Sequence, residues 1–375
     1  MNPVLSRRRL LMSGSLFAGA AAVQGLTGGS LSLVNSAMAE ITAPLSPIRM
    51  SSNENPWGPS RLAISAMEAA FDKSNLYGGI ANQIFALQAS IEGVPPDCIT
   101  LSAGSGEILQ AAAVLAAWEP GSIVAPYPTF GQLIRTAESL GTEIINVPVN
   151  KDMHIDLNAM YEAIRPDTRM VYLCNPNNPI PSIIEKKALE DFVRTVSRDR
   201  LVFVDEAYYE YVDNPDFSSM MPLVAEGLNN VIIARTASKI HGFAGLRVGF
   251  GFANPELIGR LNQVMTGSVN ILAQYGAYAS YQDREFQDFS RDMNKKGLAI
   301  IEGMCDELGM NYIKSNANFT FIETGIEIQE FQRTMREHNI LVGRPFEPFT
   351  RWARVSIAKP DEMAYFVQTY QKLYS

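Results

Sequence analysis

The sequence predicts an α/β protein with a large, doubly wound domain around a mainly parallel sheet and a smaller α/β domain after it. Strand-like apolar runs alternate with helix-like stretches between residues 99 and 234, which is typical of repeated strand–helix–strand units. The run Leu201-Val202-Phe203-Val204 is apolar throughout, as expected of a strand buried on both faces of a parallel sheet. A chain of 375 residues is long enough for two lobes.

The first 39 residues have the features of an export signal. Ser6-Arg7-Arg8-Arg9-Leu10-Leu11-Met12 is a twin-arginine pattern, and Ala37-Met38-Ala39 fits a cleavage site that would leave Glu40 first. The glycines and serines between them make a poor membrane-spanning helix, although an uncleaved anchor is the alternative. We therefore expect a twin-arginine signal peptide at residues 1–39 and a periplasmic protein without stable membrane association. Cleavage would lower the net charge from -8 to -11, because three arginines and no acidic residues are lost.

The elements of the remaining chain follow from their patterns. An N-terminal arm at 40–75 holds the turn-rich Asn53-Glu54-Asn55-Pro56 and a helix at about 60–71. For the large domain, 76–270, we expect strands at 99–101, 122–126, 143–147, 170–174, 201–204, 231–234 and 248–250, and helices at 81–92, 108–118, 129–140, 157–164, 185–196 and 255–265. A long helical stretch at about 270–308 should lead into the small domain. This linking helix and the small domain together are expected to span residues 271–375. That domain should have strands at 312–313, 319–322 and 352–357 and a helix at 327–338.

Composition excludes two classes of function. The net charge is -8 and no basic stripe occurs, which argues against a nucleic-acid binder. Three distant cysteines, Cys98, Cys174 and Cys305, have no metal-ligand spacing, and the three histidines do not cluster. We expect no metal, and the sequence does not require a disulfide.

The loop from Arg235 to Arg247 has the residues of a reactive site. Lys239 lies between two hydroxyls, Thr236 and Ser238, and a second cation, Arg247. A nearby like charge disfavours the ammonium form, and a neutral amine is what a Schiff-base nucleophile requires. The hydroxyls and Arg247 suit a phosphate. The alternative is an ordinary surface loop with one solvated lysine.

Other candidate residues also follow predicted strands, where ligands of doubly wound sheets bind. Ser102-Ala103-Gly104-Ser105-Gly106-Glu107 is a glycine-rich turn into a helix, whose free N–H groups favour a phosphate. Asp205 ends a buried apolar strand, which is costly without a cationic partner. A capping role is the alternative for Asp205.

Together these residues resemble the class I/II aminotransferases, pyridoxal-phosphate enzymes of fold type I, and within them the histidinol-phosphate aminotransferases. The resemblance extends from Asn53-Glu54-Asn55-Pro56 to Arg354-Val355-Ser356-Ile357. It implies that Lys239 attaches the cofactor covalently and then moves the substrate's proton. It also implies that Asp205 pairs with the pyridine nitrogen, and that Tyr208 and Asn178 bind the ring's 3′-oxygen.

The resemblance assigns the remaining site residues as well. Phosphate contacts would come from Ser105, Gly106, Glu107, Thr236, Ser238 and Arg247. Phe130 would stack on the ring, and Tyr77 would reach the cofactor phosphate of the partner subunit in a homodimer. Arg354 would bind the substrate α-carboxylate with its planar fork. Arg344 is a candidate second anion site, or simply a solvated arginine.

Some residues depart from the family pattern. Ile180-Pro181 stands after Asn178-Pro179 where the family usually has Thr-Gly, and Ala358 replaces a common glycine. Histidine biosynthesis is cytoplasmic, so an exported relative is expected to act on another substrate. We expect transfer of an amino group between an amino acid and a 2-oxo acid by a ping-pong route, with the donor and acceptor open.

Three other functions are compatible with parts of this pattern. A related pyridoxal-phosphate lyase, decarboxylase or racemase would use the same cofactor and break another bond. A non-catalytic binding protein would be expected to lose Lys239 or Asp205, and both are present. A dinucleotide-binding protein is disfavoured because no Gly-x-Gly-x-x-Gly follows the first strand.

Overall fold

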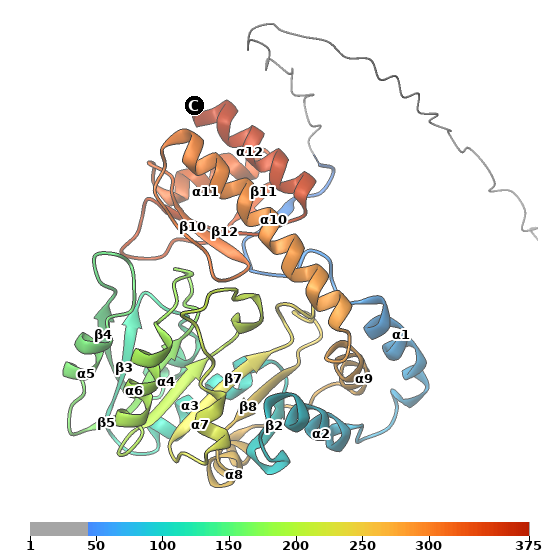
Figure 1. Cartoon of the computed structure of the whole chain (residues 1–375), viewed down its shortest axis with the longest axis vertical. Coiled ribbons are helices and arrows are strands. Elements are labelled where there is room, and N and C mark those ends of the chain that lie inside the picture. Colours follow the sequence, from blue (N-terminus) through green and yellow to red (C-terminus); the bar gives the residue numbers. More distant parts are fainter. Residues whose placement is uncertain (1–43, 375) are drawn as a thin grey trace, which may run out of the picture. The chain divides into compact units, whose positions relative to one another are not determined.

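The computed structural model describes residues 44–374, so the predicted signal peptide lies outside the described residues. Its centre is a seven-stranded sheet (Figure 1). In order across the sheet, the strands are β2 (Ile99–Ser102), β8 (Gly249–Phe252), β7 (Val231–Thr236), β6 (Leu201–Asp205), β5 (Thr168–Cys174), β3 (Ser122–Tyr127) and β4 (Glu143–Pro148). β8 is antiparallel to both of its neighbours, β2 and β7, and the other pairs of this sheet are parallel. The predicted doubly wound, mainly parallel sheet is confirmed.

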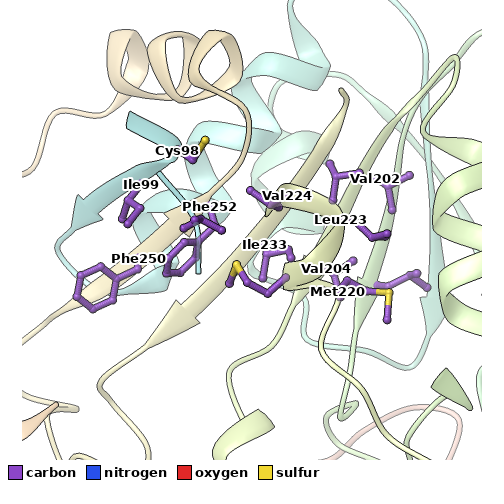
Figure 2. Close-up of a cluster of buried hydrophobic side chains, with 14 of the residues drawn as sticks. Cys98, Ile99, Val202, Val204, Met220, Leu223, Val224, Ile233, Phe250 and Phe252 are labelled. Atoms are coloured by element: carbon purple, nitrogen blue, oxygen red, sulfur yellow. The ribbon is translucent and has the colours of Figure 1, made fainter. Parts of the chain in front are cut away.

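Successive residues of a strand point to opposite faces of the sheet, so apolar strands leave two apolar faces to be covered. Helices cover both faces of this sheet. Val202, Val204 and Ile233 belong to one hydrophobic cluster (Figure 2), which also includes residues of α2 (Ala81–Glu92), α5 (Leu157–Glu162), α6 (Lys186–Val196), α7 (Met221–Ala225) and α9 (Ile271–Ser280). Phe203 and Ile232 belong to another cluster with α3 (Ser105–Ala117), α4 (Gln132–Ser139) and α8 (Pro255–Val264). Burial on both faces explains why residues 201–204 of β6 are all apolar.

The smaller domain has its own sheets and core. β12 (Trp352–Ser356), β10 (Phe319–Glu323) and β9 (Tyr312–Ile313) form an antiparallel sheet in that order, and β1 (Ile48–Met50) pairs in parallel with β11 (Ile340–Val342). The helices are α10 (Arg284–Leu308), α11 (Ile328–Glu337) and α12 (Pro360–Tyr374). Met50 of the N-terminal arm is fully buried in this core. The arm thereby ties the start of the described chain to the smaller domain.

The helical stretch expected at 270–308 is two helices in the structure. The Asp283 carboxylate accepts the N–H of Phe286 at 3.1 Å and so caps a new helix, α10. α9 packs against α1 (Arg61–Ala69) and contributes to a core of the large sheet, whereas α10 contributes Ile301 to the core of the smaller domain. No helix among residues 44–374 has the length and apolar character to cross a membrane.

Candidate active site

Residues predicted from distant parts of the sequence meet at one cavity of about 220 Å³. Its lining includes Phe130, Asn178, Tyr208, Lys239, Arg344 and Arg354. Asn178 follows β5, Tyr208 follows β6 and Lys239 follows β7, so each lies beyond the carboxyl end of a parallel strand. This is where an open α/β sheet positions a ligand.

Lys239 is a partly buried amine with few partners. Its Nζ donates a hydrogen bond to the carbonyl oxygen of Asn53 at 3.1 Å and lies 5.2 Å from the centre of the Tyr208 ring. Burial, helped by the positive charge of Arg354, lowers the pKa of Lys239 to about 8, although Asp205 opposes the shift. The neutral, nucleophilic amine is therefore accessible near neutral pH.

The lowered pKa predicts how Lys239 reacts with an added aromatic aldehyde. Only the neutral amine attacks a carbonyl, so the rate of modification at Lys239 should rise with pH and level off above about pH 8. Borohydride trapping followed by mass spectrometry measures this rate. A modification rate that keeps rising until the pH reaches the pKa of an ordinary lysine would contradict the lowered pKa of Lys239.

Asp205 is a buried carboxylate, 2% exposed, at the end of β6. Its Oδ1 accepts the N–H of Ala207 at 3.1 Å. Burial raises the pKa of Asp205 to about 7, although the Ala207 N–H and the charge of Lys239 lower it. Among residues 44–374, no lysine or arginine forms an ion pair with it. A protonated pyridine nitrogen is a cation that would stabilise this carboxylate.

The turn at Gly104, the start of α3 and the side chain of Arg247 form a candidate phosphate-binding cradle. The guanidinium of Arg247 lies over Gly104, since a Cβ at Gly104 would meet its Nη2 at 2.1 Å. Gly104 has φ +83°, and a Cβ on Gly249 would meet the Ser105 nitrogen at 2.2 Å. Glycine is favoured at Gly104 by its positive φ and at Gly249 by the close approach of the two backbones.

Hydroxyl groups complete the cradle. Thr236 Oγ1 donates to Ser238 Oγ at 2.9 Å, and Arg247 Nη1 donates to Ser238 Oγ at 3.1 Å. The first N–H groups of α3, at Ser105 and Gly106, have no acceptor within the helix. Helix N–H groups, hydroxyls and a guanidinium are the donors that bind a phosphate. With the amine of Lys239 and the carboxylate of Asp205, they fit pyridoxal phosphate.

The Glu107 carboxylate binds backbone N–H groups of the protein itself. Its carboxylate accepts the N–H of Ala103 at 2.8 Å and of Gly267 at 2.5 Å. Its own N–H donates to the Gly104 carbonyl at 3.1 Å. Glu107 thus closes the turn before α3, and its predicted contact with a phosphate stays a prediction.

Arg354 on β12 is a buried cation without an acidic partner. It is 9% exposed, and its Nη1 donates to Asn178 Oδ1 at 2.8 Å. Its Nε has no hydrogen-bond partner, and no carboxylate in residues 44–374 pairs with it. Burial lowers the pKa of Arg354 to about 10. An uncompensated guanidinium facing a cavity is a binding site for a carboxylate.

The Tyr208 hydroxyl accepts two amide N–H groups, from Asn178 at 3.1 Å and from Asn53 at 3.0 Å. Its proton is therefore free to be donated to a ligand oxygen. Burial raises the pKa of Tyr208 above its ordinary value, so the hydroxyl keeps that proton.

Asn53 is a site residue that sequence reasoning did not assign. It adopts φ +54°, which asparagine tolerates better than most residues. Its Oδ1 accepts the Ser356 hydroxyl at 2.7 Å, and its carbonyl accepts both Lys239 and Asn318. The turn-rich Asn-Glu-Asn-Pro was visible in the sequence, but these contacts to both domains were not.

The unusual Ile180 fastens the Asn178 loop to the smaller domain. Its side chain is fully buried in a cluster with Phe321 of β10 and Phe346. Phe346 also lines the cavity. At position 180, where the family usually has threonine, the apolar side chain therefore makes a fixed contact beside the site.

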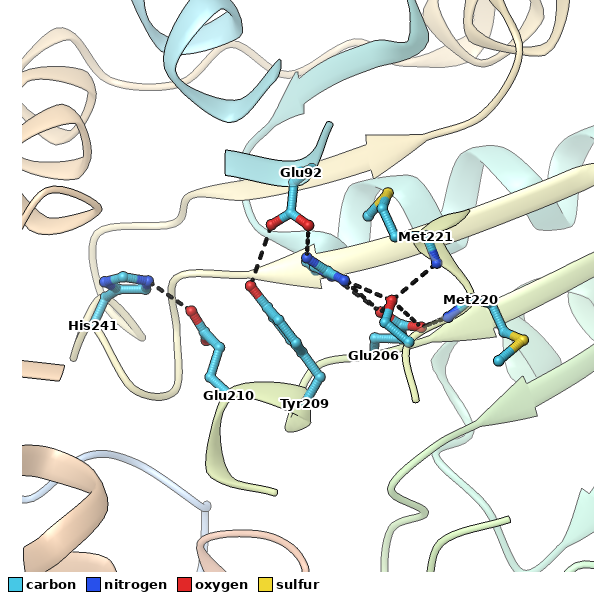
Figure 3. Close-up of polar contacts among 9 residues, drawn as sticks. Glu92, Glu206, Tyr209, Glu210, Met220, Met221 and His241 are labelled. Atoms are coloured by element: carbon cyan, nitrogen blue, oxygen red, sulfur yellow. Dashed lines mark hydrogen bonds and ion pairs between the residues drawn. The ribbon is translucent and has the colours of Figure 1, made fainter. Parts of the chain in front are cut away.

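A second set of polar contacts includes Glu206, next to Asp205 in the sequence, and His241, two residues after Lys239 (Figure 3). Arg235, on β7, is buried and forms ion pairs with Glu92 of α2 and with Glu206 at 2.9 Å. His241 lies between Glu210, at 3.0 Å, and the Ser280 hydroxyl, at 2.9 Å. Glu206 and His241 are sequence neighbours of Asp205 and Lys239, so the network holds both loops in place. Sequence reasoning missed it because its partners are far apart in the chain.

Two of the predicted site residues, Tyr77 and Arg344, are exposed to solvent. Tyr77 is fully exposed, with 107% relative accessibility, and does not line the cavity. Its contact with a partner subunit stays a prediction. Arg344 is exposed, donates to the carbonyl of Pro345 at 3.0 Å and lies 4.2 Å from the Phe346 ring centre.

Comparison with known proteins agrees with this site. The sequence model of the family Aminotransferase class I and II matches residues 46–369. Histidinol-phosphate aminotransferase from Moorella thermoacetica is 38% identical over 298 residues, which are 79% of this chain and 77% of that protein. Histidinol-phosphate aminotransferase 1 from Nitrosococcus oceani is 34% identical over 331 residues, which are 86% and 88% of the two chains. The histidinol-phosphate aminotransferase structure from Sinorhizobium meliloti in complex with pyridoxal-5'-phosphate has a TM-score of 0.79 at 23% identity, over 88% of this chain and 92% of that chain. The chain belongs to the class I and II aminotransferase family.

Proposed function

We propose that the protein is a pyridoxal-phosphate-dependent aminotransferase that moves an amino group between an amino acid and a 2-oxo acid. One observation carries this proposal. A nucleophilic lysine, a buried aspartate and a buried arginine, Lys239, Asp205 and Arg354, converge, and neither Asp205 nor Arg354 has an ion-pair partner among residues 44–374. A cofactor with a cationic ring nitrogen and a substrate carboxylate would supply both missing charges.

The residues of the site divide the chemical tasks among them. Bound pyridoxal phosphate supplies an electron-withdrawing ring that stabilises negative charge at the substrate α-carbon. Asp205 would keep the ring nitrogen protonated, and Asn178 and Tyr208, which are hydrogen-bonded to each other, would bind the 3′-oxygen. Arg354 binds the α-carboxylate and so orients the Cα–H bond. The Lys239 amine takes the α-proton and holds it for return, as a general base and then an acid.

A cavity of about 220 Å³ beside a single reactive lysine has room for one substrate at a time, so the amino acid and the 2-oxo acid would bind in turn. We therefore expect ping-pong kinetics. Product analysis separates this reaction from its rivals on the same cofactor. A transaminase turns over only with a 2-oxo acid present and yields one new amino acid per 2-oxo acid consumed. A decarboxylase or lyase would release carbon dioxide or a fragment without an acceptor, and a racemase would yield the enantiomer.

Replacing Gly104 with alanine tests the phosphate cradle. The added Cβ meets Arg247, and φ +83° is strained for alanine, so affinity for pyridoxal phosphate should fall about 10-fold or more. Fluorescence titration of the apoprotein measures it. Gly245→Ala is the matched control, because a Cβ there meets nothing within 4 Å. Equal affinities for the two variants would show that no phosphate binds at Gly104.

We further propose a homodimer in which Tyr77 reaches the partner's cofactor phosphate. Phe71, Leu76 and Tyr77 are 65%, 59% and 107% exposed on one segment, and exposed apolar groups gathered in this way favour an interface. Light scattering gives the mass. Mixing Tyr77→Phe with Lys239→Ala should restore activity, since a hybrid dimer would hold one intact site. A fully active monomer would refute this proposal.

We also propose export to the periplasm, supported by the twin-arginine motif and the small-residue site before Glu40. Cell fractionation should find the wild type in the periplasm, and replacement of Arg7 and Arg8 by lysine should retain it in the cytoplasm. Equal distribution of the two proteins would contradict a twin-arginine signal. Export favours a substrate other than histidinol phosphate.

A further inference from the structure

A small buried cavity lies between the N-terminal arm and α10. Its volume is about 10 Å³, and its lining includes Asn55 of the arm, Ser290 and Asn294 of α10, and Asn318, which precedes β10. Each of these four polar residues is at most 8% exposed. Among residues 44–374, no charged side chain lines the cavity, and it shares no lining residue with the cavity at Lys239. Its volume is about what one water molecule needs.

Two oxygens of this lining accept no hydrogen bond within the described residues. They are Oδ1 of Asn294 and Oδ1 of Asn318. The amide nitrogen of Asn294 donates to the Ala317 carbonyl at 3.0 Å, and that of Asn318 donates to the Asn53 carbonyl at 3.0 Å. These carbonyls fix both amide orientations, because a flipped amide would turn an oxygen toward a carbonyl. A buried acceptor without a donor is costly, so both oxygens require a donor that the chain does not supply.

Ser290 provides a third polar group at the cavity. Its Oγ accepts the Nδ2 of Asn55 at 3.2 Å, so the hydroxyl proton can be donated to another acceptor. Ser290 and Asn294 are four residues apart on α10 and therefore share one face of that helix. The cavity thus offers two acceptors and one donor. A water molecule, which donates two protons and also accepts, complements them with the three hydrogen bonds that buried waters typically make.

A cation fits this lining less well than water does. An ammonium ion has only donors and could not accept the proton of Ser290. A metal ion would bring a charge that no carboxylate at the cavity balances, and burying such a charge is costly. The neutral lining therefore favours water.

The polar groups of the cavity are connected to Lys239 through the arm. The Asn53 carbonyl accepts both Lys239 Nζ, at 3.1 Å, and Asn318 Nδ2, at 3.0 Å. Asn55 Nδ2 also donates to the carbonyl of Ile240, the next residue after Lys239, at 2.8 Å. A group that fixes the side chain of Asn318 therefore also fixes the carbonyl that holds the reactive amine.

We propose that this cavity binds one water molecule that positions Lys239. The water donates to Oδ1 of Asn294 and of Asn318 and accepts the proton of Ser290. It thereby joins α10 to the arm, and Ser290 and Asn294 are positioning residues that touch no substrate. The water site is independent of the proposed function, whereas its effect on turnover rests on that function.

A high-resolution crystal structure of the cofactor-loaded protein tests the water directly. One ordered water should lie about 2.5–3.0 Å from the two Oδ1 atoms and from Ser290 Oγ. Side chains that close on one another and leave no density between them would refute the proposal. Crystals grown with rubidium chloride distinguish an ion from water, since anomalous scattering at this position would assign a cation and overturn the water.

Replacing Asn294 with leucine tests the positioning role. Leucine has the branched shape of asparagine but no acceptor, so it should exclude the water. The kcat should fall about 10-fold with little change in KM, because Lys239 is misplaced while Arg354 is not. The control is Asp292→Leu, at an exposed residue of α10 outside the lining. Circular dichroism checks that both variants fold.

Modification of Lys239 by an aldehyde gives a readout that needs no turnover. A carbonyl that accepts from the ammonium form stabilises it, so a displaced Asn53 carbonyl should lower the pH at which modification levels off to below about 8. If this pH falls but neither the wild type nor Asn294→Leu transaminates, the proposed function fails and the positioning role stands. If Asn294→Leu matches Asp292→Leu in kcat and in this pH, the positioning role is refuted and the transaminase stands.

Discussion

Replacing Lys239 with alanine is expected to abolish transamination while the protein still folds. Lys239 Nζ is the amine at the cavity, and its one hydrogen bond goes to the Asn53 carbonyl. Loss of the proton-transfer role alone should lower kcat by about 10²- to 10⁴-fold. Steady-state kinetics with circular dichroism as a folding check measure this. Lys151→Ala, at an exposed lysine, is the control and should retain full activity.

Chemical rescue separates the proton-transfer role from a role in packing. A small primary amine in solution can enter the space left by the side chain and carry the α-proton in its place. Added ethylamine should therefore restore part of the rate to Lys239→Ala, with a pH dependence that follows the pKa of the added amine. A variant within about 10-fold of wild type without any amine would refute the assigned role.

Replacing Asp205 with asparagine should have opposite effects on activity and on stability. Asparagine keeps an oxygen that can accept the Ala207 N–H but loses the charge that, under the proposed function, would hold the ring nitrogen protonated. Removing one partner of a buried ion pair typically costs about 3–5 kcal/mol, so kcat should fall roughly 100-fold or more. The matched control is Asp199→Asn, at an exposed residue two positions before β6 begins.

The stability effect is expected in the apoprotein and depends on pH. Burial raises the pKa of Asp205 from its ordinary value to about 7, so the folded state binds this proton more tightly than the unfolded state. Wild-type stability should therefore decrease as pH rises from about 4 to about 7. Asp205→Asn lacks this loss and should be more stable than wild type at pH 8, by about 1–4 kcal/mol. Urea unfolding at both pH values tests it, and a less stable variant at pH 8 would contradict the expected cost of the buried charge.

Much of the fold could be predicted because buried parallel strands leave a strong pattern. The apolar runs at β5, β6 and β7 marked the sheet, and its topology then placed Asn178, Asp205 and Lys239 at one edge. The β1–β11 pair was missed because three residues in each strand are too few to show alternation. α12 was also missed, although Pro360 at its first position, with Asp361 and Glu362 in the first turn, is a helix-start signal.

The parts of the site that escaped prediction depend on packing between distant segments. Asn53, near the start of the described residues, contacts Lys239 in the middle of the chain and Ser356 near its end. Arg135 and Arg344 come together only when α4 and the loop after β11 line the same cavity. Nothing in the residues around Arg135 distinguishes it from a solvated helix arginine. A sequence pattern reports local burial and spacing, whereas these contacts need the folded coordinates.

A single half-reaction tests the assigned role of Lys239 most directly. The purified, cofactor-loaded protein is mixed with an excess of amino donor, without any 2-oxo acid, for a panel of acidic, neutral and basic donors. We expect one equivalent of 2-oxo acid per active site and then no more, with a change in visible absorbance that an added 2-oxo acid reverses. Lys239→Ala should show neither the product nor the change. Continued product release without an acceptor, or an identical response from Lys239→Ala, would show that this site does not transaminate through Lys239.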